Sequence, residues 1–196
     1  MKYLAVGLIL ITIIFFVMQA YSSKTTRKTE SYKYSVVKKY DGFEIRKYEA
    51  SNFSYVTMNT SKYSESSRFG FRALAGYIFG GNEEQQSIAM TSPVAMSLDD
   101  SVTMMFMVPS EYEINDLPKP NNKNVKFKQE PEKTIAALTF GGWASDEKIE
   151  KYTEKLKFLL KENNIGHKNN FSYFGYNPPY EIVNRRNEIV VELKAQ

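Results

Sequence analysis

The feature that most constrains the fold is an order of elements that occurs twice along the chain. Residues 44–58 (EIRKYEASNFSYVTM) and 126–140 (KFKQEPEKTIAALTF) match at a constant offset, which pairs Val56 with Leu138. Each stretch is followed by a helical pattern and then by two strand-like runs. Such a repeat predicts one supersecondary unit that is used twice. We therefore expect an α+β domain with pseudo-twofold symmetry, built from a duplicated strand-strand-helix-strand-strand unit.

The strands are expected to form an antiparallel sheet, either twisted or curled into a distorted barrel. Asp41 and Gly42 separate two strand-like runs, and this dipeptide is a strong signal for a hairpin turn. Residues 51–58 (SNFSYVTM) carry apolar side chains on both faces, which predicts a central strand. The remaining predicted strands cover residues 87–98, 101–109, 171–183 and 187–193.

Two helices are expected, over residues 64–79 and 146–163. Ser64 or Ser66 can cap the first helix, and Gly80 ends it. A helix that only covers a sheet needs one apolar stripe, and the second helix has one. The first helix has two stripes, on different sides.

The second stripe of the first helix has the composition of a ligand-binding surface. Its small residues are flanked by aromatic rings and an arginine, and that shape can receive a flat ligand. Contact with a loop or a partner chain is the alternative use of the stripe. The stripe consists of Phe69, Arg72, Ala73, Gly76 and Phe79.

An apolar run precedes the domain. No charged residue lies between Tyr3 and Tyr21, and about twenty apolar residues suffice to span a bilayer. We therefore expect residues 1–23 to form a hydrophobic helix that is a membrane anchor or a cleaved signal. Residues 24–33 are expected to be a polar tether, and residues 34–196 the folded domain.

The two rules that set the orientation of this segment disagree. Lys24, Arg27 and Lys28 follow the segment, and the positive-inside rule would place them in the cytoplasm. A signal-anchor in an export pathway would place them outside. We expect a domain that is held at a membrane through residues 3–21 and is extracytoplasmic. The alternative is a cleaved signal and a secreted or periplasmic domain.

Composition excludes several classes of function. Three of the four net positive charges derive from the first 31 residues, because the chain after residue 31 has 22 basic and 21 acidic residues. Nucleic-acid binding is therefore not expected. The chain has no cysteine, which excludes disulfides and thiolate metal sites. Its one histidine, His167, lies in a polar stretch and is a weak candidate for a metal ligand.

The domain resembles the SOUL family of heme-binding proteins. The resemblance is carried by residues 71–96 (FRALAGYIFGGNEEQQSIAMTSPVAM) and 174–193 (FGYNPPYEIVNRRNEIVVEL), and it extends over roughly residues 34–193. It implies a pseudo-twofold α+β fold and reversible binding of heme or another tetrapyrrole, with no established catalysis. Protein partners are not indicated.

The resemblance also implies where the ligand binds. In the family, the first helix and the loop before the last strand border the proposed pocket. A porphyrin needs apolar walls, and its propionates need cations. The residues of this chain that match these needs are Arg68, Phe69, Arg72, Ala73, Gly76, Phe79, Tyr176 and Arg185.

Two other functions are consistent with the same sequence. A small-molecule sensor or protein-interaction module could use this fold without binding heme. An enzyme that acts on a tetrapyrrole would need an acid or base near the ring, and Tyr176 and Glu181 are the candidates. No constellation of paired catalytic groups accompanies them, so no enzymatic activity is expected.

Overall fold

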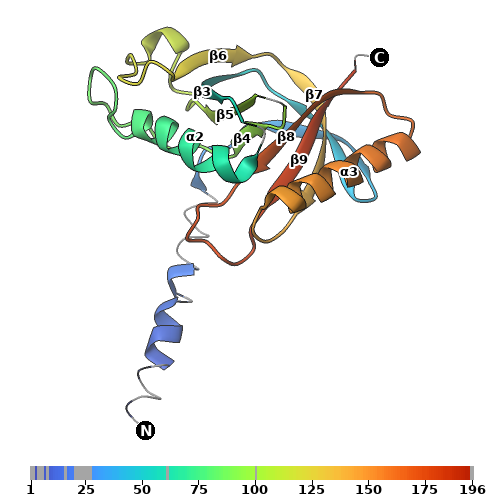
Figure 1. Cartoon of the computed structure of the whole chain (residues 1–196), viewed down its shortest axis with the longest axis horizontal. Coiled ribbons are helices and arrows are strands. Elements are labelled where there is room, and N and C mark those ends of the chain that lie inside the picture. The colour runs from blue at the N-terminus through green and yellow to red at the C-terminus, as the bar shows by residue number, and fades with distance from the viewer. Residues whose placement is uncertain are drawn as a thin grey trace.

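The computed structural model describes residues 3, 7, 9–15, 17–19, 28–60, 62–99 and 101–194. The domain is α+β, with a nine-stranded antiparallel sheet in the order β1-β2-β7-β9-β8-β4-β5-β3-β6 (Figure 1). The strands are β1 Tyr34–Tyr40, β2 Phe43–Tyr48, β3 Ser51–Met58, β4 Val94–Ser97, β5 Val102–Met107, β6 Lys126–Glu130, β7 Lys133–Phe140, β8 His167–Gly175 and β9 Asn187–Leu193. The helices are α2 Tyr63–Ile78, the short 3-10 helix η1 Ile114–Asp116 and α3 Asp146–Glu162.

Two very short connections force the sheet to curl. Residues 49–50 join β2 to β3, and residues 131–132 join β6 to β7. Each pair of strands is six positions apart in the sheet order, which would be about 29 Å in a flat sheet. Two residues can span only about 11 Å. The sheet therefore bends sharply, although β1 and β6 remain its open edges.

The two bends lie side by side. Tyr48 is the register partner of Lys133, and Ser51 is the register partner of Glu130, so β2–β3 and β6–β7 run next to each other through the corner. The sheet consequently has a convex face and a concave face. Of the two predicted alternatives, the structure has the twisted sheet, which curls but does not close into a barrel.

The helices cover only one face of this sheet (Figure 1). Helix α2 packs on β3 and β5, and α3 packs on β7, β8 and β9. Leu74 of α2 and Leu156 of α3 are fully buried in the core on this face. A second, aromatic cluster fills the opposite face, which α2 and α3 leave uncovered. This face is the concave one, because the rings of Tyr48 on β2 and Phe174 on β8 lie 6.3 Å apart there although their strands are not neighbours. The cluster contains Tyr32, Tyr48, Phe53 and Phe174 together with smaller apolar residues.

The sequence predictions for the first half are mostly confirmed. Gly42 forms the predicted hairpin turn with φ of 86°, and β3 is an internal strand between β5 and β6. The predicted serine cap of α2 is wrong. The backbone N–H of Tyr63 donates instead to the Asp146 carboxylate, at 2.7 Å, so the start of α3 caps the start of α2.

Two predicted strands are shorter than expected. β4 begins only at Val94, because Pro93 before it has no N–H to donate to a strand ladder, and the chain there forms isolated bridges such as that between Ser31 and Ser92. β8 ends at Gly175, and residues 176–186 form a loop around two prolines that cannot donate to a strand ladder. That the two halves arose from a duplicated unit stays a prediction.

Packing of the domain begins before residue 34. The backbone N–H of Tyr32 donates to the carbonyl of Ser92 at 2.8 Å, and only 4% of Tyr32 is exposed. The predicted N-terminal helix lies partly outside the described residues. Among the described residues, no helix is both long and apolar enough to cross a membrane.

The turn after α2 supplies a test of the fold. A Cβ at Gly81 would lie 2.4 Å from the carbonyl oxygen of Gly76, which is backbone and cannot move aside. Gly81→Ala is expected to lower the free energy of unfolding by about 1–3 kcal/mol in urea denaturation. Gly76→Ala is the control, because its Cβ would meet nothing within 4 Å, and alanine should stabilise the helix by up to about 1 kcal/mol. Equal effects would contradict this packing.

Candidate functional site

The predicted second stripe of α2 lies on the outside of the helix. We define the α2 outer face as Arg68, Phe69, Arg72, Gly76 and Phe79, all of which are exposed. The Phe69 side chain is 66% exposed and that of Phe79 is 67% exposed, which is unusual for residues of this type. Ala73 is half-buried at the border of this face and packs on the core.

The centre of the α2 outer face is flat. Phe79 is ten positions after Phe69 in the chain, which corresponds to about 15 Å along the helix axis. Between them, Gly76 presents bare backbone with open space above it. The face therefore offers two aromatic side chains, a gap and two guanidinium groups on one surface. This arrangement can receive a flat apolar ligand that carries carboxylates.

A hollow adjoins the α2 outer face at Phe69. It is widely open to solvent and has a volume of about 410 Å³; small-molecule sites, which enclose most of their ligand, commonly have about 300–1,000 Å³. Its walls come from the end of β3 and the first turns of α2. The lining residues are Thr57, Met58, Asn59, Thr60, Glu65, Ser66 and Phe69.

Arg185 is engaged in holding the loop at residues 176–186. Its guanidinium donates to the carbonyl of Asn177 at 3.2 Å, of Pro178 at 2.8 Å and of Glu181 at 2.5 Å. The same group lies 4.0 Å from the centre of the Trp143 ring. These contacts close the loop upon itself and against the turn before α3, and they occupy most of the donors of this side chain.

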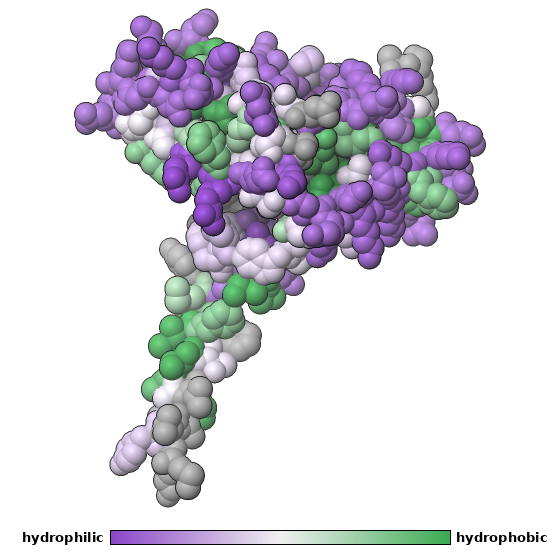
Figure 2. Space-filling view, in the orientation of Figure 1, coloured by the Kyte–Doolittle hydropathy of each residue, from purple (hydrophilic) through white to green (hydrophobic). Residues whose placement is uncertain are grey.

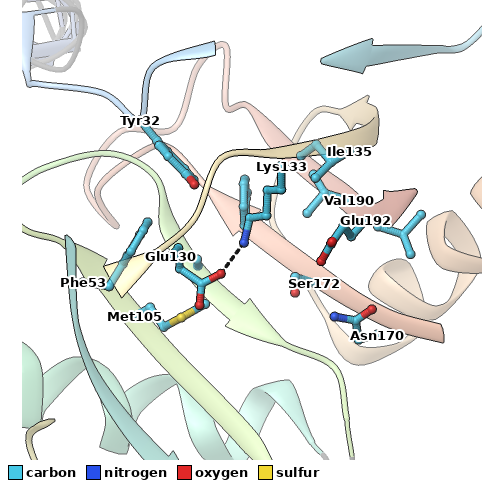
Figure 3. A pocket seen from close by; sticks show the side chains of 13 residues that line it. Tyr32, Phe53, Met105, Glu130, Lys133, Ile135, Asn170, Ser172, Val190 and Glu192 are labelled. Atoms are coloured by element: carbon cyan, nitrogen blue, oxygen red, sulfur yellow. Dashed lines mark hydrogen bonds and ion pairs between the residues drawn. The ribbon is translucent and has the colours of Figure 1, made fainter. Parts of the chain in front are cut away.

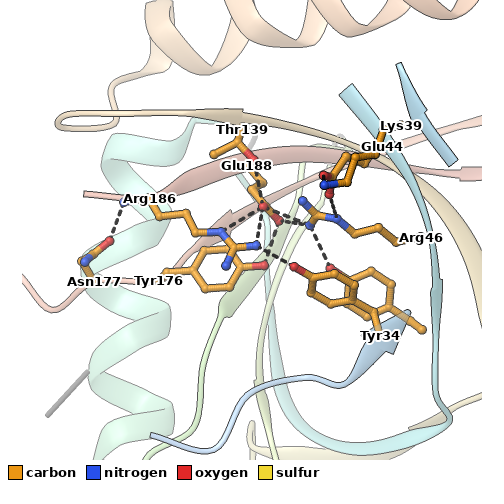
Figure 4. A network of polar contacts seen from close by, with 10 residues as sticks. Tyr34, Lys39, Glu44, Arg46, Thr139, Tyr176, Asn177, Arg186 and Glu188 are labelled. Carbon is orange, nitrogen blue, oxygen red and sulfur yellow. Dashed lines mark hydrogen bonds and ion pairs between the residues drawn. The ribbon is translucent and has the colours of Figure 1, made fainter. Parts of the chain in front are cut away.

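Tyr176 belongs to a buried polar network centred on Glu188 (Figure 4). Glu188 has no exposed surface. Its carboxylate accepts hydrogen bonds from Arg46 at 2.9 Å, from Arg186 at 2.7 Å and from the Tyr176 hydroxyl at 2.8 Å. Thr139 adds a fourth donor at 3.0 Å. The network links β2, β7 and β9 with the end of the loop.

The charges in this network settle its protonation. Burial alone would raise the pKa of Glu188, but the positive charges of Arg46 and Arg186 hold that pKa below its ordinary value. Burial and the Glu188 charge raise the pKa of the Tyr176 hydroxyl well above its usual range. The group is therefore a carboxylate that accepts from neutral tyrosine and two guanidiniums. It has neither a free proton to give nor an open lone pair directed at solvent.

The structure separates the predicted site residues into two groups. Phe69 and Gly76 lie on α2 and Phe79 follows directly after its last residue, and α2 packs on one face of the sheet. Tyr176 packs with the aromatic cluster on the opposite face. The α2 outer face thus brings together most of the predicted residues, while Tyr176 and Arg185 are held by other contacts.

The concave face contains a small cavity, shown in Figure 3. Its volume is about 50 Å³, far below the range of about 300–1,000 Å³ for ligand pockets. An ion pair between Lys133 and Glu130, at 2.5 Å, crosses its edge. The buried Tyr32 hydroxyl, which has no hydrogen-bond partner among the residues that the structure describes, lines it. The cavity has room for a few water molecules but not for a tetrapyrrole.

His167 lies at the start of β8. Its ring packs against Phe171 with a centroid distance of 5.4 Å, and Nδ1 lies 2.5 Å from the carbonyl oxygen of Lys168. In the part of the chain that the structure describes, no three His, Asp or Glu side chains gather in a way that could hold a metal ion. The role of His167 as a ligand stays a prediction.

Comparison with known proteins agrees with the sequence resemblance. The family model described as SOUL heme-binding protein matches residues 29–192. The chain belongs to the SOUL family. It is 28% identical over 155 residues to heme-binding protein 1 of Xenopus laevis, covering 75% of this chain and 81% of that protein. It is also 28% identical over 156 residues to human heme-binding protein 2, covering 75% of this chain and 76% of that protein.

Solved structures share the fold at low sequence identity. The C-terminal domain of EcmrR superposes with a TM-score of 0.61 at 10% identity, covering 83% of this chain and 99% of that one. A protein described as a hydrolase from Listeria innocua superposes with a TM-score of 0.56 at 8% identity, covering 78% and 91%. The SOUL family is a heme-binding family and not a known enzyme family, and heme is the ligand that membership implies.

The Glu188 network is the main feature that sequence reasoning missed. β9 reads NEIVVEL, and the alternation of a strand places Glu188 on the same face as Val190. An acid on the apolar face of a strand is a signal for a buried ion pair. Its partner Arg46 stands in the β2 run FEIRKY and is 3% exposed. Their pairing depends on the strand order, which the sequence pattern does not reveal.

The buried carboxylate gives a test of this arrangement. Glu188→Gln is expected to lower the free energy of unfolding by about 3–5 kcal/mol, because the buried Arg46 loses its fully buried counter-ion and keeps only the partly exposed Glu44. Glu192→Gln is the control on the same strand, since its ion pair with Lys168 is partly exposed and should contribute less than about 1 kcal/mol. Urea denaturation at pH 7 measures both.

The difference in stability between the wild type and Glu188→Gln is expected to depend on pH. The pKa of Glu188 is lowered in the folded state, so its stabilisation is present above the ordinary pKa of a glutamate and is lost as the pH falls below that value. The difference in stability between the wild type and Glu188→Gln should therefore shrink on acidification below about pH 4.5. A difference that stays constant down to pH 2 would contradict the ion pair.

Proposed function

We propose that the domain binds heme or another tetrapyrrole reversibly, with the flat side of the ligand against the α2 outer face. The observation that carries the proposal is the pair of exposed side chains Phe69 and Phe79 on either side of the open surface at Gly76. Because these two aromatic side chains are exposed, they do not stabilise the core and are available to a ligand. Membership of the SOUL family supplies the chemical class of the ligand.

The residues of this face fit the group. Phe69 and Phe79 would contact the apolar ring, and the hollow beside Phe69 would take one of its edges. Arg68 and Arg72 are exposed and would pair with the propionates, since guanidinium groups bind carboxylates well. Heme, when bound, would supply an iron centre that can take up further ligands.

The α2 outer face offers no side chain that would coordinate the heme iron. The α2 outer face carries no His, Cys, Met or Tyr, which are the side chains that hold heme iron in proteins. Met58 lines the adjoining hollow and has a thioether, but its side chain packs against the backbone of Gly70. We propose that affinity comes mainly from the ring and the propionates, which suits reversible binding. Tyr176 and Arg185 would act by shaping the loop at residues 176–186.

We further propose that residues 3–21 hold the protein at a membrane, where it would buffer or carry the ligand. The support is the uncharged apolar run in the sequence. An extracytoplasmic domain is the proposed orientation, and a cleaved signal with release of the domain is the alternative. A small-molecule sensor or interaction module without heme binding is the competing function.

A heme titration with one matched pair of variants tests the site. Full-length protein in detergent micelles is titrated with hemin, and the Soret band is followed. Saturable one-to-one binding is expected, and Gly76→Trp should weaken it at least tenfold (about 1.4 kcal/mol) because the indole would fill the gap. Gly76 has open space above it, so the variant should fold normally.

The control places the same side chain on the other helix. Lys155 is exposed on α3, and Lys155→Trp should leave the affinity for hemin unchanged. Equal affinities of the wild type and Gly76→Trp would remove the α2 outer face as the site. Absence of saturable binding in the wild type would favour the sensor or interaction module.

A further inference from the structure

Two neighbouring loops expose a group of large apolar side chains. We define the loop-tip patch as Trp143, Tyr180, Ile182 and Val183, which are 52%, 66%, 49% and 46% exposed. Trp143 comes from the turn before α3, and the other three come from the loop at residues 176–186. The loops touch, because Arg185 stacks on the Trp143 ring at 4.0 Å. A group of exposed apolar side chains of this kind usually marks a surface that binds another molecule or a membrane.

The apolar N-terminal segment leads directly to this patch. The Gln19 side chain donates to the carbonyl of Tyr180 at 3.0 Å and accepts from the backbone N–H of Ile182 at 3.0 Å. Several described residues before it are exposed and apolar, including Ile11 at 67% and Val17 at 62%. Figure 2 shows apolar and weakly polar residues gathered where this segment meets the domain, while the rest of the visible surface is largely hydrophilic.

The chemistry of the patch matches the interface of a lipid bilayer. Trp and Tyr are enriched at the level of the lipid headgroups, where the ring is buried and its polar edge stays wet. Cations border the patch: Arg185 lies on Trp143, and the Lys148 ammonium donates to the carbonyl of Gly141 at 2.6 Å. The acid within the loop, Glu181, is only 2% exposed. Arg185 and Lys148 thus place positive charge beside the patch, next to the exposed acid Glu147 in the first turn of α3, and the match to a bilayer is carried by the aromatic and aliphatic side chains.

We propose that the loop-tip patch docks the folded domain onto the surface of a lipid bilayer. The proposal rests on the proposed membrane role of residues 3–21, because that run would bring the patch to the bilayer. It goes beyond that role, since a tether alone would leave the domain free in water. Docking fixes which end of the domain faces the lipid.

The single tryptophan of the chain makes docking measurable. Trp143 is that residue, so intrinsic fluorescence reports on the patch alone. Full-length protein is reconstituted into vesicles of phosphatidylcholine with phosphatidylglycerol, and flotation establishes that it is bound. Acyl chains brominated near the headgroup are expected to quench Trp143, and its emission should shift to shorter wavelength relative to protein in 6 M urea.

Variants distinguish docking from simple tethering. The double variant Ile182→Ser/Val183→Ser should still float with the vesicles but lose most of the quenching. Phe158→Ser is the matched control, because Phe158 is equally exposed, at 60%, but lies on α3, and its quenching should equal that of the wild type. Circular dichroism checks that each variant is folded.

Two results would overturn the proposal. One is wild-type protein that floats with the vesicles while Trp143 is unaffected by brominated lipid, which would mean a tethered domain that stands off the bilayer. The other is wild-type protein that does not float at all, which would also remove the membrane role of residues 3–21. A hemin titration of the same samples reports separately on the α2 outer face, so failure of heme binding is distinguishable from failure of docking.

Discussion

The shape of the domain depends on the two short connections at the corner of its sheet. Residues 49–50 and 131–132 each join strands that a flat sheet would keep far apart. The resulting curl gives the sheet one face that two helices can cover and another that closes over its own aromatic side chains. The concave side is left with a cavity of only about 50 Å³. This cavity has no room for a ligand as large as a tetrapyrrole, and we propose the α2 outer face as the surface that binds it.

The buried polar groups on the concave face of the sheet hydrogen-bond to one another and stabilise the fold. Glu188 is surrounded by Arg46 of β2 and by Tyr176 and Arg186, which are the two ends of the loop at residues 176–186. A buried carboxylate with several charge-assisted hydrogen bonds has little left to offer a ligand. Its position near the start of β9 also holds the loop at residues 176–186, through Tyr176 and Arg186. The loop that carries the loop-tip patch is thus anchored on both sides.

Sequence reasoning succeeded where a pattern is local. The Asp41–Gly42 turn, the two helices and the separate apolar stripes of α2 follow from spacing alone, and the structure has them. It failed where a partner comes from a distant segment. The cap of α2 is supplied by Asp146 on the other helix, and the strand order brings Arg46 to Glu188. The sequence suggests Arg185 as a candidate cation, but it does not reveal that three carbonyl groups engage its guanidinium.

A crystal structure of the hemin complex tests most directly where the ligand lies. The ring should lie on α2 with one face over Gly76, between Phe69 and Phe79, and with its propionates toward Arg68 or Arg72. A ring seated against the Glu188 network or on the concave face of the sheet would contradict the claim, because the sheet would then have to open to admit it.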